Sequence, residues 1–280
     1  MPTLIQMTGG MSPLRANITR SFMTNERGVV KRYIVTPDKH APLHDKKAIS
    51  VVKQSIEMLK PDGYIDLGDF SEWSSVSHWQ WKNRKKPPLE YLIPAVNADI
   101  EATNKLFDEI DDSLDKANVE ERHFCMGNHE EWIINFVEAH PYLTDYNYET
   151  ASGVIERGYQ LHQPGEYFNI GKLHFYHGHH FGGQYHTSNH LRKLGVSIMY
   201  GHYHSMQMMA TTGLNGPIEA WSIGCLKDMS NEKNKWLKGR PHQWVHSFAI
   251  VDYYNGDDFS VTPVKIVNGK ATLWGHTLKG

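Results

Sequence analysis

Five short polar clusters in this sequence concentrate residues that bind metal ions. They are Asp38-x-His40, Gly68-Asp69, Gly127-Asn128-His129-Glu130, His177-Gly178 and Gly201-His202-Tyr203-His204. Asp-x-His is common by chance, whereas the third and fifth clusters are more specific because they combine rarer residues. Together the clusters offer carboxylate, amide and imidazole groups, a mixed oxygen and nitrogen set that suits manganese, iron or zinc rather than calcium alone. Glycine beside the ligands lets the backbone turn tightly and approach an ion closely.

Each cluster follows an apolar run that predicts a β-strand or a hairpin. The strands are expected over 32–36, 64–67, 123–126, 167–170, 173–176 and 196–200, and helices over 46–60, 95–115, 131–139 and 189–194, with Asp45 capping the first helix. The first strand, first helix and second strand form a βαβ unit, whose strands are parallel. Because ligands collect at the carboxyl ends of strands in open α/β sheets, we expect the five clusters to converge.

The composition is that of an ordinary globular protein, with 280 residues, 40% hydrophobic and 21% charged. Residues 1–30 lack periodicity and are expected to form an N-terminal extension, whereas 31–280 are expected to form one α/β domain. Two sheets packed face to face, with helices outside, are the predicted architecture. The net charge of -2 gives no global basic footprint for nucleic acid, although a local one stays open.

No apolar run is long enough to cross a bilayer, and the N-terminus lacks the apolar centre of a signal peptide. These features predict a cytoplasmic protein with no membrane association. Cys125 and Cys225 lie in apolar stretches, so buried free thiols are expected rather than a disulfide.

The order of the five clusters resembles that of the calcineurin-like metallophosphoesterase superfamily, and the match spans residues 33 to about 226. The resemblance implies a four-layer α/β/β/α sandwich with two mixed sheets, in which the β-rich tail completes the second sheet. It also implies a dinuclear centre of two divalent ions. Manganese is the expected metal, with iron, zinc and nickel as alternatives.

The same resemblance assigns a role to each motif residue. Asp38, His40 and His204 would bind one ion; Asn128, His177 and His202 would bind the other; and Asp69 would bridge both. His129 would face the substrate and stabilise the transition state or protonate the leaving oxygen. Two cations about 3.5–4 Å apart make hydroxide available near neutral pH and stabilise charge in a phosphoryl displacement.

The implied activity is hydrolysis of a phosphoester. Protein phosphatases of the superfamily carry arginines beside the second and third motifs, but this chain has Phe70-Ser71-Glu72-Trp73 and Cys125-Met126 there. Without these arginines to clamp a phosphate dianion, a diester of nucleic acid or nucleotides is the favoured substrate. A phosphomonoesterase and a non-catalytic metal-binding interaction module are the alternatives.

One segment after the second motif mixes aromatic and basic residues. DNA or RNA could bind it through Trp73, Trp79, Trp81, Lys82, Arg84, Lys85 and Lys86. The slightly favoured alternative is that the tryptophans anchor a long loop over 72–88 and that the charges are solvated.

Several further polar residues have two interpretations. Glu72 is either an acceptor behind a metal ligand or solvated, and Glu130 either caps the following helix, which is favoured, or orients His129. His179 and His180 either line the pocket or serve their loop. For His186 and His190, which have i, i+4 spacing, a polar helix face is favoured over a metal site.

Overall fold

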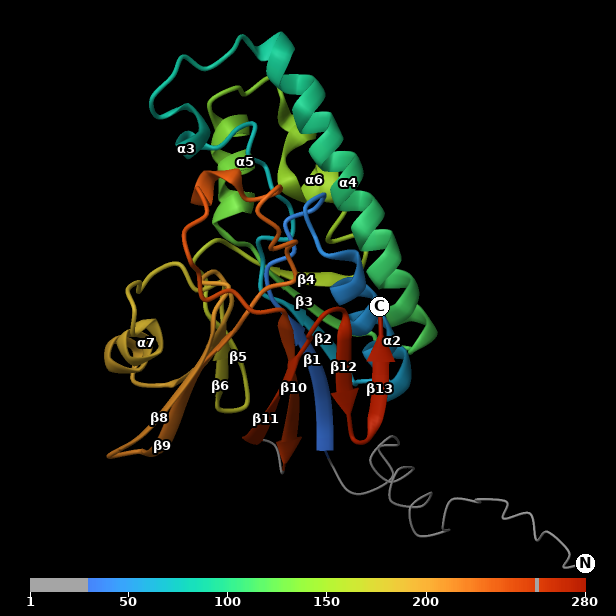
Figure 1. The fold of residues 1–280 in the computed structure, drawn as a ribbon, viewed down its shortest axis with the longest axis vertical. Helices are drawn as coiled ribbons and strands as arrows, with labels where there is room; N and C mark the ends of the chain where they lie inside the picture. Colours follow the sequence, from blue (N-terminus) through green and yellow to red (C-terminus); the bar gives the residue numbers. More distant parts are fainter. Residues whose placement is uncertain (1–29, 255–256) are drawn as a thin grey trace, which may run out of the picture.

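The computed structural model describes residues 30–254 and 257–280. The predicted extension over 1–30 therefore lies, except for its last residue, outside the described residues. Two mixed sheets form the centre of the molecule (Figure 1).

The first sheet has six strands in the order β11-β10-β1-β2-β3-β4. These strands are β11 (Asp258–Lys265), β10 (Ser247–Tyr254), β1 (Val30–Thr36), β2 (Gly63–Asp66), β3 (Glu121–Cys125) and β4 (Tyr159–His162). Strands β1 to β4 are mutually parallel, and β10 and β11 are antiparallel to their neighbours. The loops that follow the parallel strands carry residues of the candidate site.

The second sheet has five strands in the order β5-β6-β7-β9-β8. They are β5 (Phe168–Ile170), β6 (Leu173–Phe175), β7 (Ser197–Tyr200), β9 (Gly216–Ile223) and β8 (Met206–Gly213). Strands β6, β7 and β9 are parallel, and β5 and β8 close the two edges antiparallel. A separate hairpin, β12 (Lys270–Leu273) and β13 (His276–Lys279), lies beside α2 (Lys46–Leu59).

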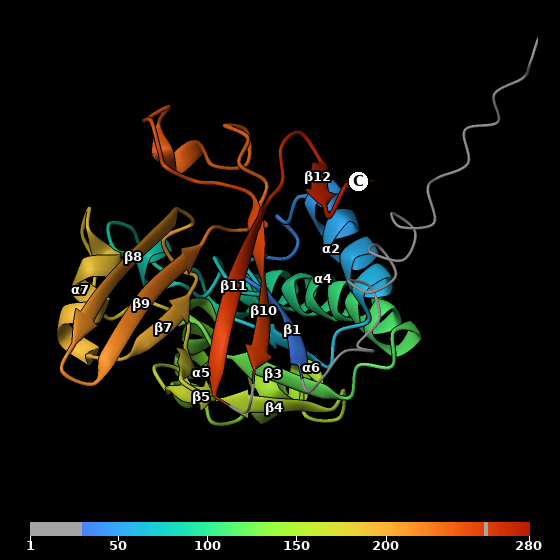
Figure 2. The same cartoon turned by 90° about the horizontal axis from the view of Figure 1, so that it is seen from below.

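Helices cover the outer faces of the two sheets (Figures 1 and 2). The first sheet is covered by α2 and α4 (Leu89–Lys116), and the second by α7 (His186–Leu194). The other described helices are α3 (His78–Trp81), α5 (Asn128–Glu138) and α6 (Tyr148–Ser152), with two 3-10 turns, η1 (Thr144–Tyr146) and η2 (Lys235–Leu237). Asp45 caps α2 as predicted, because its side chain accepts a hydrogen bond from the Ala48 N–H at 2.8 Å.

Successive side chains of a central strand point to opposite faces of the sheet, one towards the helices and the next towards the other sheet. In β1, Ile34 packs towards the helical side together with Ile56 of α2 and Phe107 of α4. Its neighbour Val35 points the other way, into a cluster with Met199 of the second sheet. Leu191 of α7 covers the outer face of that second sheet. The predicted arrangement of mixed sheets packed face to face with helices outside is thus confirmed.

The β-rich tail does not complete the second sheet, so this prediction was wrong. Strand β10 pairs with β1, and β11 pairs with β10, in the first sheet. The reason lies in β10 itself: Phe248 and Ile250 face the helices, and Ala249 and Val251 face the second sheet. A strand that is apolar on both faces needs cover on both sides, and the position beside β1 provides it.

Two local predictions also needed correction. The loop over 72–88 contains the short helix α3, which the Ser77 hydroxyl caps at the Trp79 N–H. Helix α4 starts at Leu89, before the predicted start, and includes Pro94, whose missing N–H removes one backbone hydrogen bond from the helix. Both cysteines are buried and free, as expected.

Among the described residues, none of the helices combines the length and apolar character needed to cross a bilayer.

Candidate metal centre

The five polar clusters converge where the two sheets meet. Asp38 and His40 follow β1, Asp69 follows β2, and Asn128 begins α5 directly after β3. The second sheet adds His177 after β6, and His202 and His204 after β7. All of these positions lie beyond the carboxyl ends of parallel strands, so the topology brings distant parts of the chain together.

One group of potential ligands consists of Asp38, His40 and His204. The Nε2 atoms of His40 and His204 lie 3.1 Å apart, although the two residues are 164 positions apart in sequence. The Nε2 atom of His204 also lies 3.2 Å from Oδ2 of Asp38. All three side chains are at most 8% exposed, so their polar atoms face one another rather than water.

A second group surrounds the Nε2 atom of His177. This atom lies 3.2 Å from Oδ2 of Asp69, 3.1 Å from Oδ1 of Asn128 and 3.2 Å from Nδ1 of His202. The other ring nitrogen, Nδ1, donates to the Leu67 carbonyl at 2.8 Å. That hydrogen bond leaves Nε2 as the atom free to bind a metal, which is the usual arrangement for a ligating histidine.

Asp69 connects the two groups. It belongs with His177 and His202 on one side and with His40 and His129 on the other, and in each group the candidate atoms lie within 4.8 Å of one another. Such crowding of lone pairs in a buried site is unfavourable unless a proton or a metal cation lies between them. The donor set of carboxylates and imidazoles therefore fits divalent metal ions.

The electrostatics favour bound cations. Burial alone would raise the pKa of Asp38, but His204 and His177 outweigh it and bring the pKa to about 2. Burial would likewise raise the pKa of Asp69, yet His129 and His177 hold it well below its usual range. Burial lowers the pKa of His202 to about 3, which keeps this imidazole in the neutral form that binds metals. Both buried carboxylates are thus held in the ionised form that binds metal ions.

The backbone is left-handed at four of the predicted ligands. Its φ angles are 56° at His40, 46° at Asp69, 63° at His202 and 57° at His204. Each such conformation costs a non-glycine residue about 1–3 kcal/mol, and residues that keep it cluster at functional sites. The tight turns aim these side chains inward.

Two glycines permit the close approach of chain segments. A Cβ atom on Gly127 would lie 2.2 Å from Oδ1 of Asp69, and one on Gly201 would lie 2.2 Å from Oδ1 of Asp38. No side chain can occupy that space without displacing a carboxylate. The expectation that glycine lets the backbone approach the site is met at these positions.

Glu72 and Glu130 hold the loops that carry the predicted metal ligands. Oε2 of Glu72 lies 2.9 Å from Nδ1 of His40 and 2.9 Å from Nζ of Lys227, so Glu72 is the acceptor behind a predicted ligand. Glu130 accepts from the backbone N–H of Gly127 at 2.8 Å, which confirms that it caps α5. It also accepts from the N–H of Asp69 at 2.9 Å and so fixes the loop that carries the shared carboxylate.

His129 lies at the edge of the centre. The backbone N–H of His129 donates to Oδ1 of Asp69 at 2.9 Å, and the ring atom Nδ1 lies 2.5 Å from the carbonyl oxygen of Glu72. A carbonyl can only accept, so Nδ1 carries the hydrogen. The Nε2 atom, 3.8 Å from Oδ2 of Asp69, is free to exchange a proton with a bound molecule.

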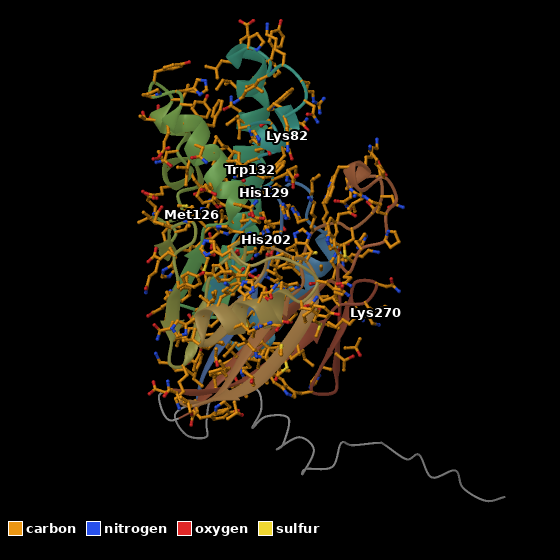
Figure 3. All side chains as sticks on the ribbon, turned by 90° about the vertical axis from the view of Figure 1, so that its left-hand side faces the viewer. Lys82, Met126, His129, Trp132, His202 and Lys270 are labelled. Carbon is orange, nitrogen blue, oxygen red and sulfur yellow. The ribbon has the colours of Figure 1, made fainter. Side chains whose placement is uncertain are left out.

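A cavity of about 620 Å³ opens over the centre. Its lining includes the aromatic residues Trp79, Trp132, Tyr203, Trp236 and Trp244. In Figure 3, His129, Trp132 and His202 lie close together at the middle of the molecule, with Lys82 above them. Bound substrate would therefore meet the predicted ligands and an aromatic wall together.

The aromatic and basic segment predicted from the sequence divides into two parts. Trp73 is 1% exposed, and Trp81 donates to the Ser75 carbonyl, so these two tryptophans anchor the loop as the favoured interpretation expected. Trp79 is 66% exposed and lines the cavity, with Lys82 Nζ 4.9 Å from the centre of its ring. Arg84, Lys85 and Lys86 are exposed.

Three of the tryptophans that line the cavity were not predicted. Trp132 follows His129 at i, i+3, the spacing that places two side chains on one face of a helix. Trp236 and Trp244 lie in a stretch whose mixture of aromatic and basic residues is similar to that of 79–86, and that similarity was the available signal.

Three further histidines have structural partners. His186 and His190 do not form an exposed polar helix face, and this expectation was wrong: they are 3% and 0% exposed. His186 contacts the Tyr200 hydroxyl and His190 the Tyr176 hydroxyl, so both hold α7 against its sheet. His180 pairs with the Tyr167 hydroxyl at 2.6 Å.

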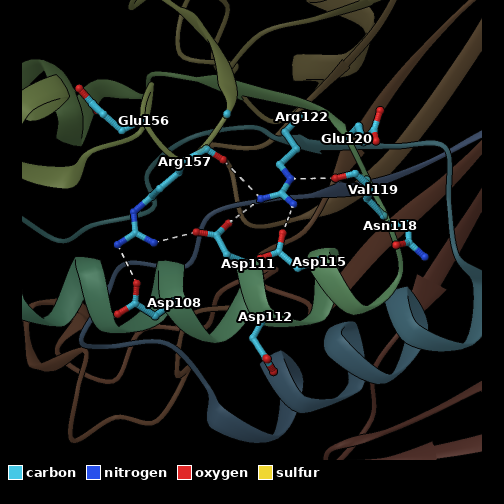
Figure 4. A pocket seen from close by; sticks show the side chains of 11 residues that line it. Asp108, Asp111, Asp112, Asp115, Asn118, Val119, Glu120, Arg122, Glu156 and Arg157 are labelled. Carbon is cyan, nitrogen blue, oxygen red and sulfur yellow. Dashed lines mark hydrogen bonds and ion pairs between the residues drawn. The ribbon is translucent and has the colours of Figure 1, made fainter.

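A larger cavity, of about 840 Å³, shares no lining residue with the centre (Figure 4). Its two arginines are already paired: Arg122 contacts Asp111 and Asp115, and Arg157 contacts Asp108 and Asp111. These ion pairs tie α4 to β3 and to the turn before β4.

The chain is similar to several known proteins along most of its length. It is 23% identical to the Gene 54 protein of Mycobacterium phage D29 and to that of Mycobacterium phage L5, over 88% of this chain and 98% of each relative. Similar solved structures include Vps29 from Entamoeba histolytica (TM-score 0.44, 14% identity, 86% of this chain and 96% of that chain). YfcE, a phosphoesterase from E. coli, has a TM-score of 0.38 and 14% identity over 82% of this chain and 98% of its own. No family model matches the chain.

Proposed function

We propose that this chain is a metal-dependent hydrolase of the calcineurin-like metallophosphoesterase type that cleaves phosphodiesters in nucleic acid or nucleotides. The observation that carries the proposal is the position of Asp69, whose carboxylate lies within 4.8 Å of candidate ligand atoms of His40 on one side and of His177 and His202 on the other, beside His129 at the cavity.

The residues that would hold the two cations are those predicted from the sequence. Asp38, His40 and His204 form one set, Asn128, His177 and His202 form the other, and Asp69 serves both. When bound, divalent cations supply hydroxide near neutral pH and neutralise charge on the phosphate. Manganese is the cation we expect, with iron, zinc and nickel as alternatives, and a cytoplasmic setting is expected for the reaction.

His129 supplies the proton in this proposal. The Glu72 carbonyl fixes its Nδ1, so Nε2 points towards Asp69 and the cavity. The ring also packs against Trp132 at an interplanar angle of 33°, with centroids 3.8 Å apart, which limits its movement. In its imidazolium form, a histidine held in this way can give the Nε2 proton to the leaving oxygen of the ester and become the neutral ring that keeps its hydrogen on Nδ1.

The charges around the cavity support a diester substrate. Of the described residues that line it, Lys227 is the single lysine or arginine, and its Nζ is already paired with Glu72 at 2.9 Å. A phosphate dianion is normally clamped by a guanidinium with two parallel hydrogen bonds, whereas a diester carries one charge and needs less. Trp79 and Lys82 beside the cavity support nucleic acid as the source of the diester.

The test compares bis-p-nitrophenyl phosphate with p-nitrophenyl phosphate, using protein stripped of metal and then reloaded with manganese, iron, zinc or nickel. We expect the diester to be cleaved faster. Faster cleavage of the monoester would favour a phosphomonoesterase. No turnover of either substrate with any of the metals would contradict an enzymatic role and favour a metal-binding interaction module.

A further inference from the structure

Two segments that are distant in sequence border the cavity from different sides. The first arm, residues 78–86, contributes Trp79, and the second arm, residues 230–244, contributes Trp236 and Trp244. Figure 3 shows the second arm, with its 3-10 turn η2, rising on the side of the site opposite α3 and α5. Any extended substrate over the centre therefore lies between the two arms.

Indole rings flank the predicted centre on both sides. Trp132 packs at a tilt against His129 with centroids 3.8 Å apart, and Trp244 packs edge-on against His204 at 4.6 Å. The ring of His40 lies between these histidines, 4.5 Å from His129 and 5.1 Å from His204. A phosphate over the centre would thus have one indole on each side, where its two neighbouring groups would lie.

The outer rings of the arms are exposed. Trp236 is 59% exposed and lies 5.9 Å from Trp244, and Trp79 is 66% exposed. The second arm is nevertheless well anchored, because Leu237 is buried and the Asn234 side chain donates to the carbonyls of Asp228 and Ser230. Large exposed aromatics on an ordered support are typical of a binding surface.

Both arms concentrate positive charge in a chain whose net charge is -2. The first arm has exposed basic residues and no acidic ones: Lys82, Arg84, Lys85 and Lys86. In the second arm the exposed basic residues outnumber the acidic Glu232: they are Lys233, Lys235, Lys238 and Arg240. Alternation of stacking platforms and cations matches a polymer of bases and phosphates.

We propose that the two arms bind single-stranded nucleic acid, with Trp132 and Trp244 flanking the scissile phosphate and with bases farther along the strand stacking on the exposed rings of Trp236 and Trp79. In a duplex both faces of each base are covered by its neighbours, so an indole can stack only on a base in a single strand or one turned out of the helix. This inference rests on the proposed diesterase function for its scissile phosphate, while the binding itself needs no metal.

The experiment measures binding by metal-free protein in EDTA, using the fluorescence anisotropy of labelled 12-nucleotide DNA and RNA strands and the matching DNA duplex. Trp236→Ala is the decisive variant because this exposed ring supports little of the fold. We expect it to bind single strands about 5- to 100-fold more weakly, the range of one lost base stack. The double variant Lys235→Ala/Lys238→Ala should bind more weakly and show a shallower salt dependence.

The matched controls are Tyr254→Ala, which removes an exposed aromatic at the end of β10, and Lys270→Ala, on the β12–β13 hairpin away from the arms (Figure 3). Both should bind like the wild type. Equal affinity of Trp236→Ala and wild type, or duplex binding as tight as single-strand binding, would overturn the proposal.

The two proposals fail in different ways. If bis-p-nitrophenyl phosphate is cleaved but single strands bind independently of Trp236, the binding role proposed for the two arms is wrong, whereas the proposed diesterase function is supported. If single strands bind through Trp236 while no phosphoester is cleaved, the binding role of the two arms is supported and the proposed catalytic function is wrong.

Discussion

Glu72 and His40 form a buried contact, with Oε2 of the glutamate 2.9 Å from Nδ1 of the histidine. The contact leaves Nε2 of His40 directed at His204, 3.1 Å away. The carboxylate therefore selects which nitrogen of a predicted ligand faces the metal site. Lys227 holds the same carboxylate from the other side.

Replacing Glu72 by Gln should weaken metal binding. Loss of the charged acceptor lets the His40 ring turn, and such changes typically cost about 10- to 100-fold in metal affinity. Calorimetric titration of metal-free protein with Mn²⁺ measures the effect, and Glu101→Gln, on an exposed position of α4, is the control. Unchanged affinity would show that the contact with His40 is dispensable.

His129→Ala should leave both cations bound but slow turnover. Because His129 is not one of the predicted metal ligands, the variant should bind as many metal ions per chain as the wild type does. Loss of the proton donor should reduce the turnover of bis-p-nitrophenyl phosphate by about 10²- to 10⁴-fold. His140→Ala, which alters a histidine at the end of the same helix, should retain full activity. Wild-type rates in His129→Ala would refute the assigned role.

Asp69→Asn should abolish activity and the pairing of the cations. Its carboxylate serves both ligand groups, and an amide offers one oxygen and half of the ligand capacity. Elemental analysis of the purified variant should find at most one tightly bound ion per chain. Asp145→Asn, at an exposed position, is the control, and two tightly bound ions in Asp69→Asn would disprove the bridging role.

Gly201→Ala should disturb the site through sterics alone. Its added Cβ would lie 2.2 Å from Oδ1 of Asp38, so the carboxylate or the loop has to shift. Overpacking of this kind costs about 1–3 kcal/mol, which a urea denaturation curve can resolve. Gly213→Ala, whose Cβ meets nothing nearer than 4.0 Å, should unfold like the wild type. Equal stability of the two variants would show that the loop adapts freely.

Asp99 should make the protein less stable as pH rises. Burial, aided by Glu72, raises the pKa of this carboxyl from 3.8 to about 7. Since the folded state holds the proton more tightly than the unfolded state, the stabilisation is complete below about pH 4 and is lost as the pH rises through about 7. In Asp99→Asn the free energy of unfolding should therefore fall less between pH 4 and 8. Parallel pH profiles for variant and wild type would contradict the shifted pKa.

The sequence predicted most strands correctly because apolar runs ending at glycine or proline indicate buried strands whatever their partners are. It failed for β10 and β11, where the choice of sheet depends on which neighbour offers cover for both faces. It failed also for His186 and His190, because i, i+4 spacing identifies a helix face but not the layer against which that face packs.

By itself the sequence determined the order, type and spacing of the candidate ligands, since these follow from residue identity and from strand ends. Only the tertiary structure decided that Asp69 lies within reach of both ligand groups and that Glu72 contacts His40. It also placed Trp132 and Trp244 around the centre while burying Trp73. The physical reason is that contacts between residues far apart in the chain depend on how the two sheets pack, which no local pattern encodes.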